Sequence, residues 1–236
     1  MSVPPCRELE SLNPIMRVLY RRLAQAVNNA GLPMHPYEYF RGKARQEDGK
    51  KRGVSKAGFG QSVHNYGGAV DFVGKVGGKW SWDKVIPWKE YGKLVRREGL
   101  MWGGDFSWGF DGPHADMSTI IPMREFRLGA AADLSIFIKW LDKHDGAPAT
   151  EVAAEWFEWF TKWWVPNITG CVVRGVHLDV AAEQTLLTNL GFDLGAIDGK
   201  LGPLTRGAWG ELSLERTGTA AEDLRVLAIE CRGSAL

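Results

Sequence analysis

The spacing of apolar residues predicts a helix near the start of the chain, over residues 8–30. Apolar side chains recur there at helical spacing, and Gly31 follows as a stop signal. A second amphipathic segment, ended by Gly99, predicts another helix over 83–98.

Extended structure is predicted between and after these helices. Residues 32–61 are rich in Gly, Lys and Arg and indicate a loop with short extended pieces. The run Ala-Val-Asp-Phe-Val at 69–73 is typical of a buried strand. Another strand begins at 100–102 and is interrupted by two glycines. We therefore expect an α+β unit in which flanking helices cover a small antiparallel sheet.

The second half of the chain has a helical pattern throughout. We expect Thr150 to cap one of its helices and Pro166 to end it. Helices are predicted over 130–144, 150–164, 179–190, 203–214 and 220–231. The expected domains are a catalytic unit at 1–125, a helical connector at 126–168 and an all-α helical module at 169–236.

Charge and composition exclude some functions. The 236 residues include 29 Lys and Arg against 28 Asp and Glu, so no basic excess indicates a nucleic-acid partner. No stretch approaches the roughly 18 apolar residues of a membrane helix, and we expect no stable membrane insertion. The three cysteines are widely spaced and form no Cys-x-x-Cys pair, which argues against a thiolate zinc site and favours free thiols in a reducing compartment.

Two separated motifs contain residues suited to a catalytic metal site. The first runs from Ser62 through His64 to Asp71, and the second joins Asp111 to His114. A catalytic zinc ion takes three protein ligands from His and Asp or Glu and keeps one position open. Asp111, three residues before the last histidine, is placed to move protons beside such an ion.

A single histidine is more often a satisfied polar residue than a metal ligand, so the motif context decides. The other three histidines have no such motif context, and we expect them to be surface or core residues: His35, His144 and His177.

The segment SVHNYGGAVDF resembles the SxHxxGxAxD signature of zinc D-alanyl-D-alanine carboxypeptidases and L-alanyl-D-glutamate endopeptidases. GLMWGGDF followed by DGPH resembles the second signature of that family, and the resemblance covers roughly residues 8–117. It implies that His64, Asp71 and His114 bind one catalytic Zn²⁺ and that Asp111 is the catalytic base. The base would accept a proton from the attacking water and return it to the departing amine.

The same resemblance suggests residues that contact the substrate. Ser62 matches the motif serine, and Arg41 and Gln46 in FRGKARQ resemble an upstream arginine-glutamine element. Arg41 would polarise the scissile carbonyl or hold a substrate carboxylate, and a surface salt bridge is the alternative. Asp105 and Asp116 are expected to support the site or the fold.

The C-terminal segment LGFDLGAIDGKLGPLTRGAW, at 190–209, resembles a peptidoglycan-binding repeat, over roughly 172–215. The alternative is a helical module that only stabilises the enzyme. An aromatic stripe at 156–164 is interpreted as an interdomain core, against a membrane or glycan surface.

The resemblance is closest, at the WGGD segment, to the endopeptidase branch, which includes many phage endolysins. It implies a phage-type endolysin that hydrolyses the L-Ala–D-Glu bond of peptidoglycan, and we expect a monomer. The N-terminus has no apolar run suited to a signal peptide. We therefore expect synthesis in the host cytoplasm and action on the wall, in the periplasm, after release without a signal peptide. The alternatives are a D-Ala–D-Ala carboxypeptidase and a non-catalytic wall-binding or virion protein with a structural metal.

Overall fold

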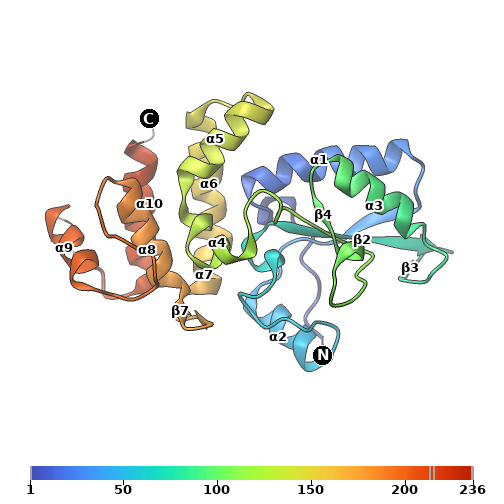
Figure 1. The fold of residues 1–236 in the computed structure, drawn as a ribbon, viewed down its shortest axis with the longest axis horizontal. Coiled ribbons are helices and arrows are strands. Elements are labelled where there is room, and N and C mark those ends of the chain that lie inside the picture. The colour runs from blue at the N-terminus through green and yellow to red at the C-terminus, as the bar shows by residue number, and fades with distance from the viewer. Residues whose placement is uncertain (1, 213, 215, 235–236) are drawn as a thin grey trace. The chain divides into compact units, whose positions relative to one another are not determined.

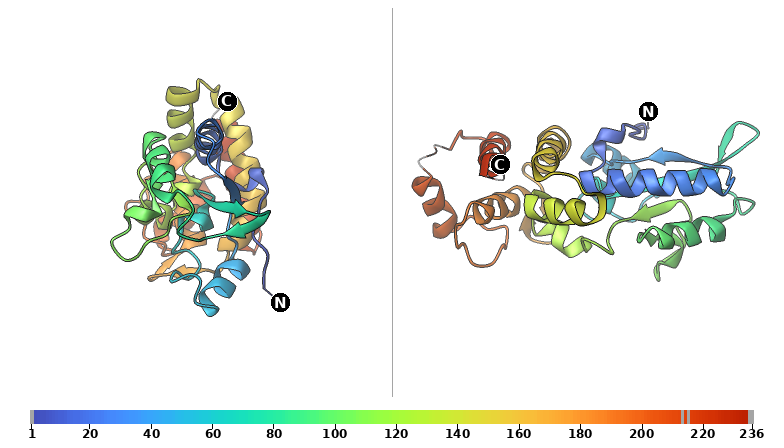
Figure 2. Two further views of the ribbon diagram at one scale, coloured as in Figure 1. Left: turned by 90° about the vertical axis from the view of Figure 1, so that its right-hand side faces the viewer. Right: turned by 90° about the horizontal axis from the view of Figure 1, so that it is seen from above.

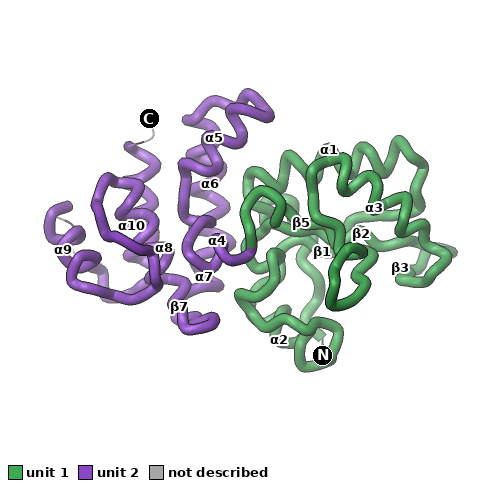
Figure 3. Tube along the Cα trace, in the orientation of Figure 1, with its two compact units in different colours: residues 1–122 green, residues 123–236 purple. Residues whose placement is uncertain are grey.

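The computed structural model describes residues 2–212, 214 and 216–234. The chain divides into two compact units, residues 1–122 and 123–236 (Figures 1 and 3). Across the described ranges, no helix is both long enough and apolar enough to cross a lipid bilayer.

A five-stranded antiparallel sheet forms the centre of the first unit. Its strands follow the order β1-β2-β5-β4, and β3 also pairs with β2. The strands are β1 (Met34–Glu38), β2 (Ala69–Val76), β3 (Lys79–Ser81), β4 (Met101–Trp102) and β5 (His114–Asp116). The predicted α+β class, with a small antiparallel sheet and flanking helices, is confirmed.

The strand predicted over 69–73 extends further and turns into a hairpin. Val76 pairs with Lys79, and the two-residue turn between them is Gly77-Gly78. Both glycines have positive φ, 56° and 78°, which is the requirement of a type I′ hairpin turn. The glycines therefore allow β2 to continue directly into β3.

Both predicted helices of this unit begin later than expected. Helix α1 spans Pro14–Asn29, because the Asn13 side chain caps it by accepting a hydrogen bond from Met16 N and proline occupies its first turn. A short 3-10 turn, η1 (Leu9–Ser11), precedes it. Helix α3 spans Trp88–Arg97 and begins directly after Pro87. In each case a proline marks the true start.

The prediction of loop throughout 32–61 was wrong over one segment, because helix α2 spans Lys43–Lys51. Only Gln46 and Gly49 of this helix are buried. A helix that is polar almost all round has no apolar period, so the pattern of hydrophobic residues did not reveal it. An i,i+4 ion pair between Asp48 and Arg52 supports its C-terminal end.

The two faces of the sheet have different roles. Phe72 of β2 contacts the ring of Tyr20 on α1 and the ring of Tyr91 on α3, so this face is covered by the two helices (Figures 1 and 2). Successive side chains of a strand point to opposite faces. Asp71 therefore points away from the helices, to the face where the chemistry is found.

The second unit is helical apart from a small ribbon of β6 (Val172–Val173) and β7 (Val176–His177). Its helical segments are α4 (Met123–Arg127), η4 (Ala130–Ala132), α5 (Leu134–Asp145), α6 (Ala149–Trp159), η5 (Phe160–Trp164), α7 (Val165–Ile168), α8 (Leu178–Asn189), α9 (Pro203–Glu211) and α10 (Ala220–Ser234).

The aromatic stripe contributes buried side chains to the core of this unit, whereas its interpretation as a core between domains stays a prediction. Trp156, Trp159, Phe160 and Trp164 are fully buried. Gly129 lets η4 approach helix α8 closely, since a Cβ on it would lie 2.3 Å from Thr185 Oγ1. The segment expected to be a connector thus packs against the segment expected to be a wall-binding module. Their separation into two domains stays a prediction.

The predicted start and end of the helix over 150–164 were both wrong. Helix α6 begins one residue before Thr150, with Pro148 at its N-cap. Pro166 does not end the helical path, because it lies in the first turn of α7, where its missing N–H costs little. The π-helical turn η5 lies directly before α7, so the helical path continues from α6 through η5 into α7.

Candidate metal centre

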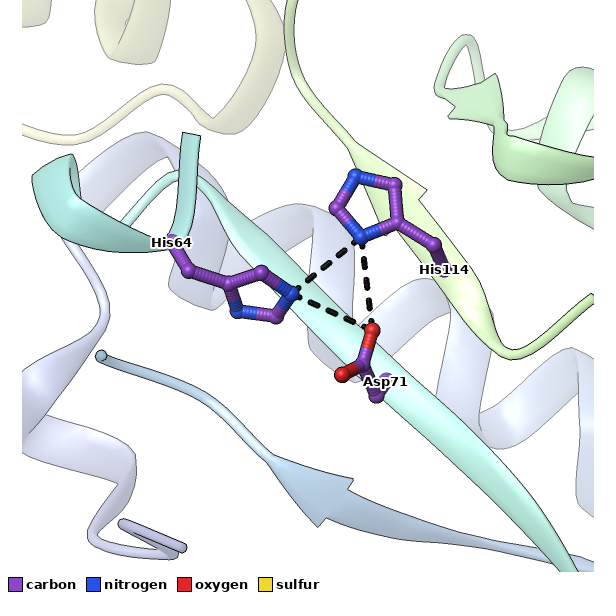
Figure 4. Close-up of side chains that lie close together, drawn as sticks. All are labelled: His64, Asp71 and His114. Atoms are coloured by element: carbon purple, nitrogen blue, oxygen red, sulfur yellow. Dashed lines mark hydrogen bonds and ion pairs between the residues drawn. The ribbon is translucent and has the colours of Figure 1, made fainter. Parts of the chain in front are cut away.

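Three side chains converge on the open face of the sheet: His64, Asp71 and His114 (Figure 4). His64 Nε2 lies 3.1 Å from Asp71 Oδ1 and 3.2 Å from His114 Nδ1. The third side of the triangle, from His114 Nδ1 to Asp71 Oδ1, measures 3.3 Å. The structure thus brings together all three residues that the motifs indicated, although one of them is fifty positions from another.

Sheet register and one tight turn produce this convergence. Asp71 of β2 and His114 of β5 are directly paired across the two strands. His64 lies in the 3-10 turn η2 (Val63–Tyr66), which ends at Gly67 with a left-handed φ of 62°. Gly68 then passes so close to Val63 that an added Cβ would lie 2.8 Å from its Cγ1. The two glycines therefore return the chain from His64 into β2.

In each of the three side chains, the nitrogen or oxygen atom that points away from the cluster has a hydrogen-bond partner of its own. His64 Nδ1 lies 2.6 Å from the Tyr39 carbonyl oxygen, and His114 Nε2 lies 2.8 Å from Asp116 Oδ2. A ring N–H that donates to these acceptors leaves the other ring nitrogen directed into the cluster. Asp71 Oδ2 accepts a hydrogen bond from Arg41 Nη2 at 3.1 Å, so Oδ1 faces the two histidines.

The donor set and its dimensions fit zinc. A tetrahedral ion with bonds of about 2.0–2.1 Å to nitrogen and oxygen places its ligand atoms roughly 3.3–3.4 Å apart. The observed separations of 3.1, 3.2 and 3.3 Å come close to this value. Two imidazoles and one carboxylate are also the ligand types that a catalytic zinc site uses.

Electrostatics favour a charged Asp71 next to the histidines. Burial by itself would raise the pKa of Asp71, but the interactions with His64, His114 and Arg41 outweigh it and hold this pKa well below the usual range. Burial would likewise lower the pKa of His114, whereas hydrogen bonds and charge from Asp116 and Asp71 raise it to about 10. The cluster therefore favours positive charge at its centre.

Asp111 lies beside this cluster, on the loop before β5, and its backbone packs closely against Gly103. The Asp111 N–H donates to the Gly103 carbonyl, and the His114 N–H donates to the Asp111 carbonyl. A Cβ on Gly103 would lie 2.4 Å from the Asp111 carbonyl oxygen. Asp111 is an exposed residue overall, but desolvation of its carboxyl and then the negative charge of Asp71 raise its pKa. A carboxyl of raised pKa is suited to accept and return a proton.

The residues predicted to contact substrate have varied surroundings. The Arg41 guanidinium bonds Glu38 and Asp71, so it already holds two carboxylates. Gln46 is fully buried, and its amide donates to Ser55 Oγ and to a backbone carbonyl. Ser62 caps the turn η2. The substrate contacts of these three residues stay predictions.

Glu38 and Tyr39 were missed by reasoning from the sequence. Glu38 is only 2% exposed and accepts hydrogen bonds from both Arg41 and Arg45. Tyr39 acts through its carbonyl, which any residue possesses, so its identity carries no signal. For Glu38 a signal existed: a carboxylate at the end of a strand, three residues before the arginine of FRGKARQ.

Comparisons with known proteins agree with this site. The sequence model of a family described as D-alanyl-D-alanine carboxypeptidase matches residues 55–117. The peptidoglycan L-alanyl-D-glutamate endopeptidase CwlK of Bacillus subtilis (strain 168) is 32% identical over 122 residues, covering 45% of this chain and 73% of the relative. A crystal structure of the Serratia marcescens L-Ala D-Glu endopeptidase ChiX is 26% identical, with a TM-score of 0.39, covering 48% of this chain and 86% of that one.

The cluster of His64, Asp71 and His114, together with the match to the family model and to CwlK, defines the chain as a peptidase. It belongs to the family of zinc peptidases that includes D-alanyl-D-alanine carboxypeptidases and L-alanyl-D-glutamate endopeptidases.

Proposed function

We propose that this peptidase is a zinc-dependent, phage-type endolysin that hydrolyses the L-Ala–D-Glu bond of peptidoglycan stem peptides. The observation that carries the proposal is the cluster of His64, Asp71 and His114, in which each side chain is fixed from outside. The choice of bond is supported by the similarity to CwlK, whose name specifies L-alanyl-D-glutamate.

His64 Nε2, Asp71 Oδ1 and His114 Nδ1 would hold the ion. When bound, zinc supplies a Lewis acid that polarises a carbonyl oxygen and makes water more acidic. Asp111 takes the proton of the attacking water and delivers it to the departing amine, for which its raised pKa is suited. Arg41 keeps Asp71 oriented and adds positive charge beside the oxygen on which negative charge develops.

The second unit is proposed to bind the wall. The turn formed by Asp198, Gly199 and Lys200 is fixed by four hydrogen bonds with the Gln184 amide, so this part of the segment that resembles a peptidoglycan-binding repeat has a defined structure. Tethering to the polymer would raise the local concentration of stem peptides around the first unit. We further propose synthesis in the host cytoplasm as a monomer and release to the periplasmic wall.

The test is analysis of the products that the zinc-loaded chain releases from purified peptidoglycan. Mass spectrometry is expected to find new fragments with D-Glu at the N-terminus. Release of free D-alanine instead would assign the D-alanyl-D-alanine carboxypeptidase activity that the matched family's description names.

A matched pair of variants tests the role of Asp111. Asp111→Asn keeps the shape of the side chain and removes its basicity, so turnover is expected to fall by about 10²–10⁴-fold. Asp105→Asn is the control, because Asp105 is exposed and pairs with Arg96 on the surface. Zinc content should equal that of the unmodified protein in both. Full activity of Asp111→Asn would exclude Asp111 as the base.

A further inference from the structure

The loop that leads to His114 exposes large aromatic side chains next to the cluster of His64, Asp71 and His114. Between η3 (Gly103–Asp105) and β5 it carries Phe106, Trp108 and Phe110. Trp108 is 66% exposed and Phe110 is 64% exposed. Aromatic surface of this size is costly to leave in water, and clusters of it typically mark binding sites.

Ring contacts connect this surface to the cluster. The ring of Phe106 lies 5.5 Å from that of His114, and it stacks on Trp108 with centroids 4.4 Å apart and planes 19° apart. Each step is somewhat longer than one extended residue of roughly 3.3–3.6 Å. A group stacked on Trp108 would thus lie about two to three extended residues of substrate away from a peptide bond at the cluster.

The loop is held in place. The Gly109 N–H donates to the Phe106 carbonyl, and Lys56 Nζ donates to the Trp108 carbonyl at 3.1 Å. Phe110 packs edge-on against the buried ring of Trp102, at 5.8 Å and 88°. The loop therefore presents its aromatic rings in a defined arrangement without an occupant, which lowers the entropic cost of binding one.

The chemistry of the proposed substrate indicates which group would bind to these aromatic rings. In peptidoglycan the first residue of the stem peptide, L-Ala, is joined through a lactyl group to the N-acetylmuramic acid ring. A scissile L-Ala–D-Glu bond therefore has this sugar a single residue away on its amino side. The D-Ala–D-Ala bond lies at the other end of the stem. Sugar rings present faces of C–H groups, which stack on exposed tryptophan.

We propose that Trp108, supported from behind by Phe106, is a stacking platform for the N-acetylmuramic acid ring that carries the stem peptide. This inference rests on the proposed function and deepens it, because only cleavage next to L-Ala places the sugar at this platform. The enzyme would accordingly distinguish stem peptides that still carry their sugar from free peptides.

The experiment compares two substrates that differ only in the sugar: a stem tetrapeptide and the same peptide bearing N-acetylmuramic acid. The zinc-loaded full chain is expected to cleave both at L-Ala–D-Glu, with kcat/KM at least about 5–10-fold higher for the sugar-bearing one, the size of an aromatic stacking contact. In Trp108→Ala the ratio of the two kcat/KM values should fall to near one. Trp108→Tyr, which retains a stacking surface, should keep most of it.

Trp82→Ala is the matched control. Trp82 is a tryptophan with 52% exposure that directly follows β3, and its ring packs edge-on against that of Tyr37. Both rates should be unchanged in this variant. Equal kcat/KM values for the two substrates in the unmodified protein, or an unchanged ratio in Trp108→Ala, would overturn the platform and leave the endopeptidase assignment standing. Failure to cleave either substrate at L-Ala–D-Glu would overturn the proposed function, and the platform with it.

Discussion

His114 and Asp116 are two residues apart on β5 and are joined side chain to side chain. His114 Nε2 lies 2.8 Å from Asp116 Oδ2, and Asp116 Oδ1 accepts a hydrogen bond from the Ser118 N–H at 2.7 Å. Asp116 is only 3% exposed. The carboxylate therefore uses both oxygens, one to hold the ring of His114 and one to hold itself.

Replacement of Asp116 by Asn should weaken zinc binding by about 10–100-fold, the range seen when a partner of a metal-bound histidine is lost. The amide has one acceptor oxygen where the carboxylate has two, so it cannot serve both His114 and the Ser118 N–H. It also lacks the negative charge that makes the imidazole a stronger ligand. A competition titration against a zinc chelator of known affinity measures the effect.

Glu98→Gln is a suitable control for the loss of charge, because Glu98 pairs with Arg97 at the surface of the same unit. Its zinc affinity should match that of the unmodified protein. If Asp116→Asn also bound zinc with unchanged affinity, Asp116 would have no part in orienting His114.

Zinc affinity should rise with pH, because zinc and a proton compete for His114. Without metal, Asp116 and Asp71 overcome the effect of burial and raise the pKa of His114 to about 10, so its ring is protonated at pH 7. Zinc requires the neutral ring. The apparent association constant is thus expected to increase about tenfold per pH unit from pH 7 and to level off near pH 10.

Stability of the metal-free protein should have the opposite dependence. A raised histidine pKa stabilises the fold fully below the unfolded value of about 6.5, and this contribution disappears as pH rises through about 10.

Calorimetric titration of zinc at pH 7, in two buffers of different ionisation enthalpy, tests the competition between zinc and the proton on His114 and should detect about one released proton. Zinc binding without proton release would contradict the protonated state of His114.

The cluster of three candidate zinc ligands was predictable from the sequence, because its residues stand in two motifs of fixed spacing. His64, Asp71 and His114 all lie where those motifs placed them. Glycines in the motifs were a second indication of the site. Gly67 occurs where the chain turns with positive φ, and Gly103 occurs where the backbone approaches Asp111 closely. Both features depend on local geometry, which the sequence expresses directly.

Features that depend on distant contacts were not predictable in the same way. Helix α2 has no apolar face, so hydrophobic periodicity contained no sign of it. The alignment of Arg41 with Glu38 and Asp71 depends on the pairing of β1 with β2, and a sequence pattern does not reveal which carboxylates an arginine meets. The exposed rings of Trp108 and Phe110 became significant only once their loop was placed beside His114.

Gly103→Ala should reduce kcat/KM by about 10²-fold, the penalty of displacing catalytic groups by roughly 1 Å. The added Cβ would lie 2.4 Å from the Asp111 carbonyl oxygen and 2.8 Å from His114 Cβ. The loop must open to relieve this overlap, and Asp111 then moves relative to His114. Steady-state kinetics on sugar-bearing stem peptides measures the loss.

Gly207→Ala is the control for this glycine substitution. Gly207 lies in helix α9 of the second unit, and a Cβ on it would meet nothing within 4 Å. Cleavage of small stem peptides should be unaffected, and the helix should gain up to about 1 kcal/mol of stability. An active Gly103→Ala variant would show that the approach of Asp111 through Gly103 is not required.

Gln184→Met should destabilise the second unit by about 2–4 kcal/mol while keeping the length and volume of the side chain. The Gln184 amide nitrogen donates to Asp198 Oδ1 and to the Lys200 carbonyl, and its oxygen accepts from the Asp198 and Gly199 N–H groups. Methionine provides none of these bonds, so the buried Gly199 N–H loses its acceptor. Hydrogen exchange of the full chain should show lost protection at Gly199, with Asn189→Ala, at the exposed end of α8, as an unaffected control. Full protection at Gly199 in Gln184→Met would mean that the turn is held by other contacts.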